Sequence, residues 1–150
     1  MFSQTAEYAL RAIVVLATDP KKSWTAQEIA AQSLVPQDYL IKVMQALTKQ
    51  GLVGAQRGRG GGFTLRRPPE IITVLDVINV VDPLRRIKTC PLGIKAHGIT
   101  LCPLHRKLDD AIRTVEEAFR STTIGELLDD STGIRPLQKG GTLCHVQYAQ

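Results

Sequence analysis

The sequence lacks any apolar run close to the roughly 20 residues that span a membrane. Its early apolar stretch, residues 6–17, is interrupted by Glu7 and Arg11 and follows no basic segment, which is not typical of a signal peptide. Internal repeats and low-complexity blocks are also missing. We therefore expect a compact domain, or a small domain with a helical extension, that works in the cytoplasm without a membrane partner.

Cysteine is scarce, with Cys90, Cys102 and Cys144 only. An odd number in a cytosolic chain argues against a disulfide framework and leaves metal binding, redox sensing or inert burial. No nucleophile–base pair and no α/β framework that would form an active-site pocket is legible, so we expect no enzyme activity.

Charge is unevenly placed along the chain. Residues 1–70 carry nine Lys or Arg against five Asp or Glu, whereas residues 71–150 carry ten against nine. A basic first half suits a polyanionic partner such as nucleic acid.

The first half has the pattern of a helix-turn-helix. Apolar residues at helical spacing predict a helix over residues 4–18, and Thr25 with Glu28 forms a capping box that starts a second helix. Only residues 33–35 separate it from a third helix over residues 36–50. Two helices joined by so short a link must cross at a large angle.

A glycine-rich tip follows the third helix. Residues 58–62 lie between two strand-like pieces at 52–57 and 63–65, which predicts a β-hairpin wing. The glycine run lacks the GK[ST] ending of a phosphate-binding loop and leads into a strand, not a helix. The fold class expected is mainly α with a small hairpin wing, a winged helix-turn-helix over residues 1–82.

The second half of the sequence predicts a helical extension of the N-terminal domain. Residues 83–102 form an irregular loop, and residues 103–130 form a long helix followed by a short final one. The long helix carries a continuous apolar stripe on an otherwise charged surface, so we expect it to pair with its symmetry mate in a homodimer. Residues 131–150 are expected to be a flexible tail.

Seven residues are candidates for DNA contact, four on the third helix and three on the wing: Gln37, Asp38, Tyr39, Lys42, Arg57, Arg59 and Gly60. Glutamine can form hydrogen bonds with adenine, aspartate can accept a hydrogen bond from cytosine, and lysine more often contacts a phosphate group. An arginine on a wing tip is suited to the minor groove. The alternative is that these residues are merely solvated polar groups on a surface helix.

Four runs resemble one known family: "EYALRA", "SLVPQDYLIKVMQALTKQGLV", "RGRGGGFTLRRPPEIITVLDVI" and "CPLH". In this order, over about residues 1–128, they look like the Rrf2 family of transcription regulators, which includes IscR-like and NsrR-like iron–sulfur sensors. The resemblance implies a homodimer that binds palindromic operator DNA. For many members it also implies a cluster held by cysteines in the loop before the long helix.

The resemblance assigns metal ligands with one departure. Cys90 and Cys102 match the first and third cysteines of cluster-binding relatives, but Ala96 stands about where the second would be. His105 matches a histidine of IscR-like members, and Glu7 matches an acidic ligand donated by the other subunit. This set implies an iron–sulfur cluster, with the 2Fe–2S type favoured and the 4Fe–4S type as the alternative.

Other interpretations of the same residues stay open. Cys90 and Cys102 could form a reversible disulfide, zinc could be held with His97, or Cys102 could be an inert buried residue. The expected function is a repressor that responds to redox state or nitric oxide through its cluster. The alternative is the same DNA-binding regulator without a cluster, controlled by a cysteine thiol switch or a protein partner.

Overall fold

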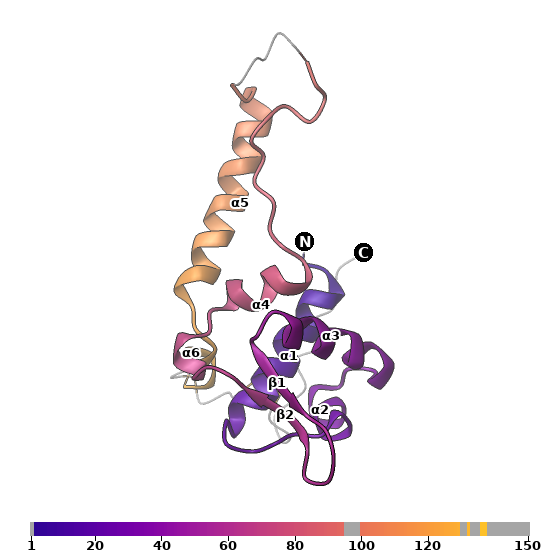
Figure 1. The fold of residues 1–150 in the computed structure, drawn as a ribbon. Helices are drawn as coiled ribbons and strands as arrows, with labels where there is room; N and C mark the ends of the chain where they lie inside the picture. The colour runs from indigo at the N-terminus through magenta and orange to yellow at the C-terminus, as the bar shows by residue number, and fades with distance from the viewer. Residues whose placement is uncertain (1, 95–99, 130–131, 133–135, 138–150) are drawn as a thin grey trace.

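The computed structural model describes residues 2–94, 100–129, 132 and 136–137. A helical head carries the hairpin at one end, and one long helix projects from the head in the opposite direction (Figure 1). The elements, in chain order, are α1 (Gln4–Thr18), α2 (Ala26–Ser33), α3 (Gln37–Lys49), β1 (Val53–Gln56), β2 (Gly62–Leu65), the 3₁₀ turn η1 (Pro69–Ile71), α4 (Val74–Val81), α5 (Pro103–Ser121) and α6 (Ile124–Leu128).

The head is built around α1, which packs against α2, α3, α4 and α6. Ser3 caps this helix by accepting a hydrogen bond from the backbone of Ala6. Small side chains on α1, among them Ala9 and Ala12, are fully buried and let neighbouring helices approach closely. Ile13 is also fully buried, so α1 forms the centre of the hydrophobic core.

The helix-turn-helix is as predicted from the sequence. The capping box of Thr25 and Glu28 starts α2, and Leu34 ends it in the left-handed conformation at φ 55°. α3 begins two residues after buried Val35. Past its end, Gly51 has φ +75°, a conformation that glycine adopts without steric cost.

The wing is the predicted antiparallel hairpin, with Val53 opposite Leu65 and Gln56 opposite Gly62. Trp24 forms an antiparallel bridge with Phe63 of β2. The N–H of Trp24 donates to the carbonyl of Phe63 at 2.9 Å, and the N–H of Phe63 donates to the carbonyl of Trp24 at 2.7 Å. This bridge ties the root of the wing to the chain just before α2.

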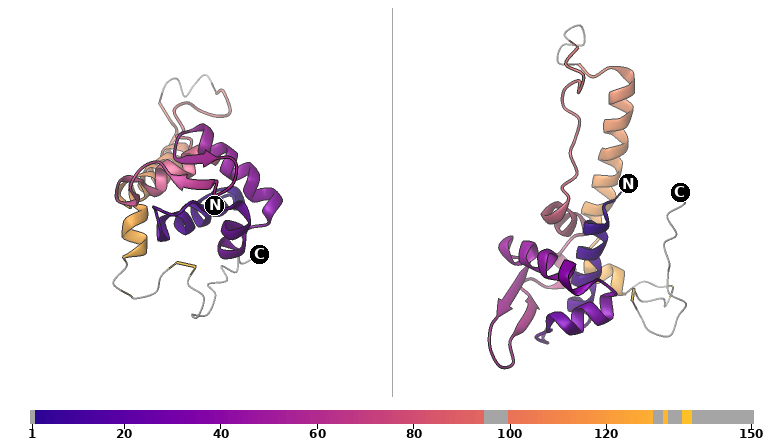
Figure 2. Two further views of the ribbon diagram at one scale, coloured as in Figure 1. Left: turned by 60° about the horizontal axis from the view of Figure 1, so that its bottom comes forward. Right: turned by 90° about the vertical axis from the view of Figure 1, so that its right-hand side faces the viewer.

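α5 projects from the head and none of its residues is buried, although Phe119 near its C-terminal end packs against Phe2 of the head. Leu104 and Leu108 leave 64% and 48% of their surface exposed. The helix rejoins the head at its C-terminal end, where Ile124 of α6 is fully buried (Figure 2). Within residues 2–94 and 100–129, no helix is long and apolar enough to cross a membrane. The expected fold class, a winged helix-turn-helix with a long C-terminal helix, is confirmed.

Candidate DNA interface and sensor site

The solvent face of α3 carries the predicted base-reading residues. Gln37, Asp38 and Lys42 are exposed, while the opposite face of α3 is buried in the core. The buried residues of this helix are Leu40, Val43, Met44 and Leu47. The helix thus offers its polar N-terminal half to solvent, as a helix that enters the major groove must.

Tyr39 has a structural role as well as an exposed position. Its hydroxyl lies 2.6 Å from the hydroxyl of Thr5, and its ring meets Tyr8 edge-on with 5.3 Å between centroids. Gln4 donates a hydrogen bond to the Tyr8 hydroxyl at 2.8 Å. These contacts fasten the start of α3 to the start of α1, and the sequence analysis missed them.

The wing tip presents its two arginines to solvent. Arg57, Arg59 and Gly60 are all exposed. The turn is tight, because a Cβ on Gly61 would lie 2.3 Å from the carbonyl oxygen of Gln56. Only glycine fits there, so Arg59 is held at the tip of a narrow hairpin.

Two of the predicted metal ligands are neighbours at the start of α5. Cys102 is the N-cap residue of this helix, and its Sγ lies 3.2 Å from Nδ1 of His105. Both side chains are half-buried.

Cys90 is a free, half-buried thiol on the segment that runs beside α5 (Figure 1). We call residues 83–94 the arm. The arm is bound to α5 through Arg86, whose Nε and Nη2 donate to Oδ1 and Oδ2 of Asp109 at 2.7 and 2.5 Å. Asp109 also accepts from the backbone N–H of Ile87 at 2.8 Å, and Arg86 Nη1 lies 3.8 Å from Glu116.

This ion pair shifts the pKa values of both Asp109 and Arg86. The hydrogen bonds from Arg86 lower the pKa of Asp109 to about 2, and the N–H of Ile87 acts in the same direction. The same pairing raises the pKa of Arg86 above its ordinary value. Only 13% of the Asp109 side chain is exposed, so the pair is partly shielded from solvent.

Glu7, the remaining predicted ligand, lies in the first turn of α1 and pairs there with Arg11. Arg11 also lies over the ring of Tyr8, 5.8 Å from its centroid. Among residues 2–94 and 100–129, no group of three or more His, Cys, Asp or Glu side chains could hold one metal ion. Ala96, His97 and Cys144 lie outside the described residues.

The model of the Rrf2 family, described as iron-dependent transcriptional regulators, matches residues 2–130. The chain belongs to the Rrf2 family. A helix-turn-helix transcriptional regulator of Aquifex aeolicus is 31% identical over 132 residues, covering 86% of this chain and 92% of that protein.

Two solved structures of regulators have the same fold. The global cysteine regulator CymR of B. subtilis superposes with a TM-score of 0.70 at 26% identity, over 85% of this chain and 95% of that one. IscR of T. potens superposes with a TM-score of 0.73 at 23% identity, over 91% and 93%. As an Rrf2 protein, the chain is a DNA-binding transcriptional regulator.

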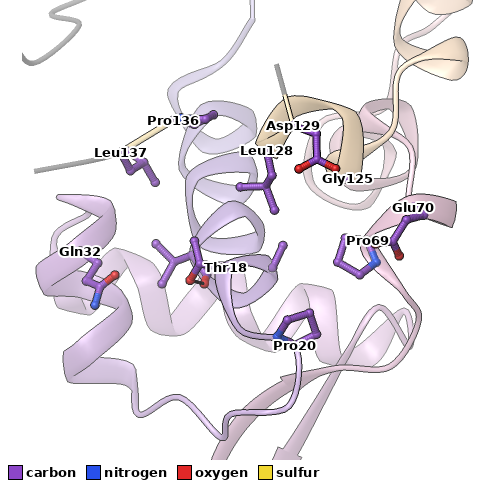
Figure 3. A pocket seen from close by; sticks show the side chains of 12 residues that line it. Thr18, Pro20, Gln32, Pro69, Glu70, Gly125, Leu128, Asp129, Pro136 and Leu137 are labelled. Atoms are coloured by element: carbon purple, nitrogen blue, oxygen red, sulfur yellow. Dashed lines mark hydrogen bonds between the residues drawn. The ribbon is translucent and has the colours of Figure 1, made fainter. Parts of the chain in front are cut away.

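The head also contains a cavity of about 580 Å³ that the sequence analysis did not predict (Figure 3). Leu137 contributes to its wall and packs against the core, although the sequence places this residue in the expected tail. The lining residues are Val15, Ala17, Thr18, Pro20, Gln32, Pro69, Glu70, Gly125, Leu128, Asp129, Pro136 and Leu137. None of them belongs to the arm or to α5, so the cavity is separate from the Cys102–His105 pair.

Proposed function

We propose that this Rrf2 protein is a dimeric regulator that senses redox state or nitric oxide through an iron–sulfur cluster and binds a palindromic operator. The observation that carries the proposal is the contact between Cys102 Sγ and His105 Nδ1 at the N-terminus of α5. A thiolate and an imidazole are both known ligands of iron–sulfur clusters. The two candidate ligands lie at the start of α5, which is also the helix best suited to form the dimer contact.

DNA recognition is assigned to α3 and the wing. Gln37 and Asp38 are free to reach base edges, and Lys42 is exposed one turn further along for a phosphate. Arg59 at the hairpin tip suits the minor groove, where a narrow groove concentrates negative potential. Two such heads related by a two-fold axis would read two half-sites of a palindrome.

The dimer contact is assigned to the exposed apolar stripe of α5. Its members recur every three or four residues and include Leu104 and Leu108, which leave 64% and 48% of their surface exposed. Ile112 and Val115, both half-buried, continue the stripe, whereas Phe119 at its end packs against Phe2 of the same chain, with 5.0 Å between ring centroids. A second copy of α5 has the same stripe, so the contact is self-complementary.

The proposed ligand set is Cys90, Cys102 and His105 of one subunit with Glu7 of the partner subunit. Two thiols, an imidazole and a carboxylate fit a cluster in donor chemistry, and the 2Fe–2S type is favoured over 4Fe–4S because only two cysteines are offered. When bound, the cluster would supply reversible electron transfer and reactivity toward nitric oxide. Glu7, a weaker oxygen donor, would be the most readily exchanged ligand.

Signal transfer would follow the backbone at the base of α5. The carbonyl of Thr122, just after α5, accepts a hydrogen bond from the N–H of Val74 at 2.9 Å, and Ile124 donates to Ile72 at 2.8 Å. A tilt of α5 caused by gain or loss of a ligand would therefore pull directly on the start of α4 in the DNA-binding head.

The test is the visible absorption spectrum of protein purified without oxygen, together with iron and sulfide analysis. We expect absorption bands that bleach or shift with a mild oxidant in the parent protein and in Cys144→Ala, the matched control. Cys102→Ala and His105→Ala should lose or alter these bands. A colourless parent that takes up neither iron nor sulfide on reconstitution would refute the cluster.

A second candidate rests on the two free, half-buried thiols, Cys90 and Cys102. In a cluster-free regulator, a peroxide would oxidise the pair to a disulfide, with two electrons and two protons passing to the oxidant. Non-reducing mass spectrometry after peroxide treatment tests this: loss of two hydrogens on the peptide pair supports it, and no change in mass excludes it. If both thiol and cluster tests fail, a protein partner would be the remaining control of DNA binding.

A further inference from the structure

One large apolar side chain of α3 lies on the side of the helix that is assigned to DNA. Ile41 leaves 42% of its surface exposed, whereas Leu40 and Val43 on the opposite side are buried in the core. A single exposed apolar residue is common on protein surfaces and indicates nothing by itself. The residues around Ile41 are what make its position informative.

Ile41 lies in the middle of a polar stripe. Gln37 and Gln45 are four residues before and four residues after it, and both are exposed. At about 3.6 residues per turn and about 1.5 Å per residue, the three side chains project from one side of α3 and cover about 12 Å of its length. Base pairs follow one another every 3.4 Å or so along a duplex, so this length corresponds to about three to four base pairs.

The orientation of the stripe is fixed by contacts on the other sides of α3. Leu40 and Met44 are fully buried in the core of the head. The hydroxyl of Tyr39 lies 2.6 Å from the hydroxyl of Thr5, so α3 cannot turn about its own axis without losing this contact. The stripe is therefore presented to a DNA groove in one orientation, and binding does not have to order the helix first.

The chemistry of the three side chains matches one kind of base pair. Glutamine forms two hydrogen bonds with N6 and N7 of adenine in the major groove. Thymine presents its 5-methyl group there, and apolar side chains pack against this group. Because both features belong to A·T pairs, a glutamine–isoleucine–glutamine stripe favours A·T pairs over G·C pairs.

We propose that Ile41 packs against the 5-methyl group of a thymine in the major groove, and that Gln37 and Gln45 bind adenines of neighbouring base pairs. The inference rests on the proposed binding of α3 to DNA and adds the sequence preference of that binding, which is A·T pairs in each half-site. Ile41 is then a specificity-determining residue, because its contact is lost when the base carries no methyl group.

The experiment removes the methyl group from the DNA and the isoleucine from the protein. The probe is a duplex enriched from a random-sequence library by the parent protein, and fluorescence anisotropy measures the affinity. Each thymine is replaced in turn by deoxyuridine, in both half-sites at once. At one position we expect the Kd of the parent to rise about fourfold per half-site, or about fifteenfold in all, as for one buried methyl group in each subunit. The same replacement should leave the Kd of Ile41→Ala unchanged.

Ile71→Ala is the matched control for loss of an exposed isoleucine. Ile71 leaves 57% of its surface exposed and lies on η1, outside α3 and the wing. This variant should respond to deoxyuridine as the parent does, and Ile41→Val, which keeps a branched apolar side chain, should show a reduced response. Equal responses in the parent and Ile41→Ala, or an enriched half-site without A·T pairs, would overturn the thymine contact.

Two further variants separate this contact from the proposed function. If Gln37→Ala and Lys42→Ala weaken binding but no thymine position responds to deoxyuridine, α3 binds DNA and the thymine contact fails. If neither variant nor any deoxyuridine changes the Kd, the assignment of DNA recognition to α3 fails as well. A colourless protein that shows the deoxyuridine response keeps the thymine contact while the proposed cluster fails.

Discussion

Leu108→Ala tests whether α5 is the dimer contact. Leu108 leaves 48% of its surface exposed in the single chain, and burying a whole leucine side chain is worth about 1.5–3 kcal/mol. Half of that, in each of two subunits, gives about 1.5–3 kcal/mol per dimer. Alanine keeps part of the contact, so we expect a loss of about 1–2.5 kcal/mol and a dimer Kd raised roughly 5- to 60-fold.

The assay is sedimentation equilibrium over a concentration series. Glu117→Ala is the matched control, because Glu117 is exposed and lies on the side of α5 opposite the stripe. Its dimer Kd should stay within about twofold of the parent value. Equal Kd values for Leu108→Ala and Glu117→Ala would refute the assignment. Loss of dimer in Leu92→Ala alone would move the contact to the arm, where Leu92 is 73% exposed.

Three further predictions concern the wing, the recognition helix and the ion pair between Arg86 and Asp109. Gly62→Ala should weaken operator binding and lower the melting temperature, because its Cβ would lie 2.5 Å from the Trp24 carbonyl oxygen. Fluorescence anisotropy measures the affinity for the operator, and calorimetry measures the melting temperature. An unchanged affinity would contradict the role of the wing. Lys42→Ala should reduce the slope of log Kd against log salt by about 2 per dimer if each copy neutralises one phosphate; an unchanged slope would remove this contact. Asp109→Asn should lower the melting temperature at pH 5–7, and the difference should shrink as pH falls from about 4 to about 2, because a depressed folded-state pKa stabilises the fold only while the group is charged. A difference at pH 2 as large as that at pH 7 would show that charge is not its cause.

The elements of the fold were predictable because their signals are local. Each capping box needs only a threonine and an acidic residue three positions later, and three such pairs start helices in the structure. These pairs are Thr25–Glu28, Thr73–Asp76 and Thr123–Glu126. The glycine-rich hairpin and the apolar stripe of α5 are likewise properties of short windows.

The contacts that organise the site were not predictable from such windows. Arg86 and Asp109 are 23 residues apart, and Thr5 and Tyr39 are 34 apart. Each of these residues is an ordinary surface type at its own position, and only the packed fold brings the partners together. The family resemblance named Cys90 and Cys102 as ligands, but it did not indicate that Arg86 and Asp109 fix the arm to α5.

α4 connects the arm and α5 to the rest of the head. The start of α4 is bonded to the end of α5 through Val74 and Thr122, and its last residue, Val81, leads into the arm. The arm and α5 are therefore attached to opposite ends of α4. α4 packs against α1 and α3, and α3 carries the residues assigned to DNA. Because a shift of the arm along α5 would move one end of α4 relative to the other, we expect it to change the orientation of α3 without any contact between the proposed sensor residues and DNA.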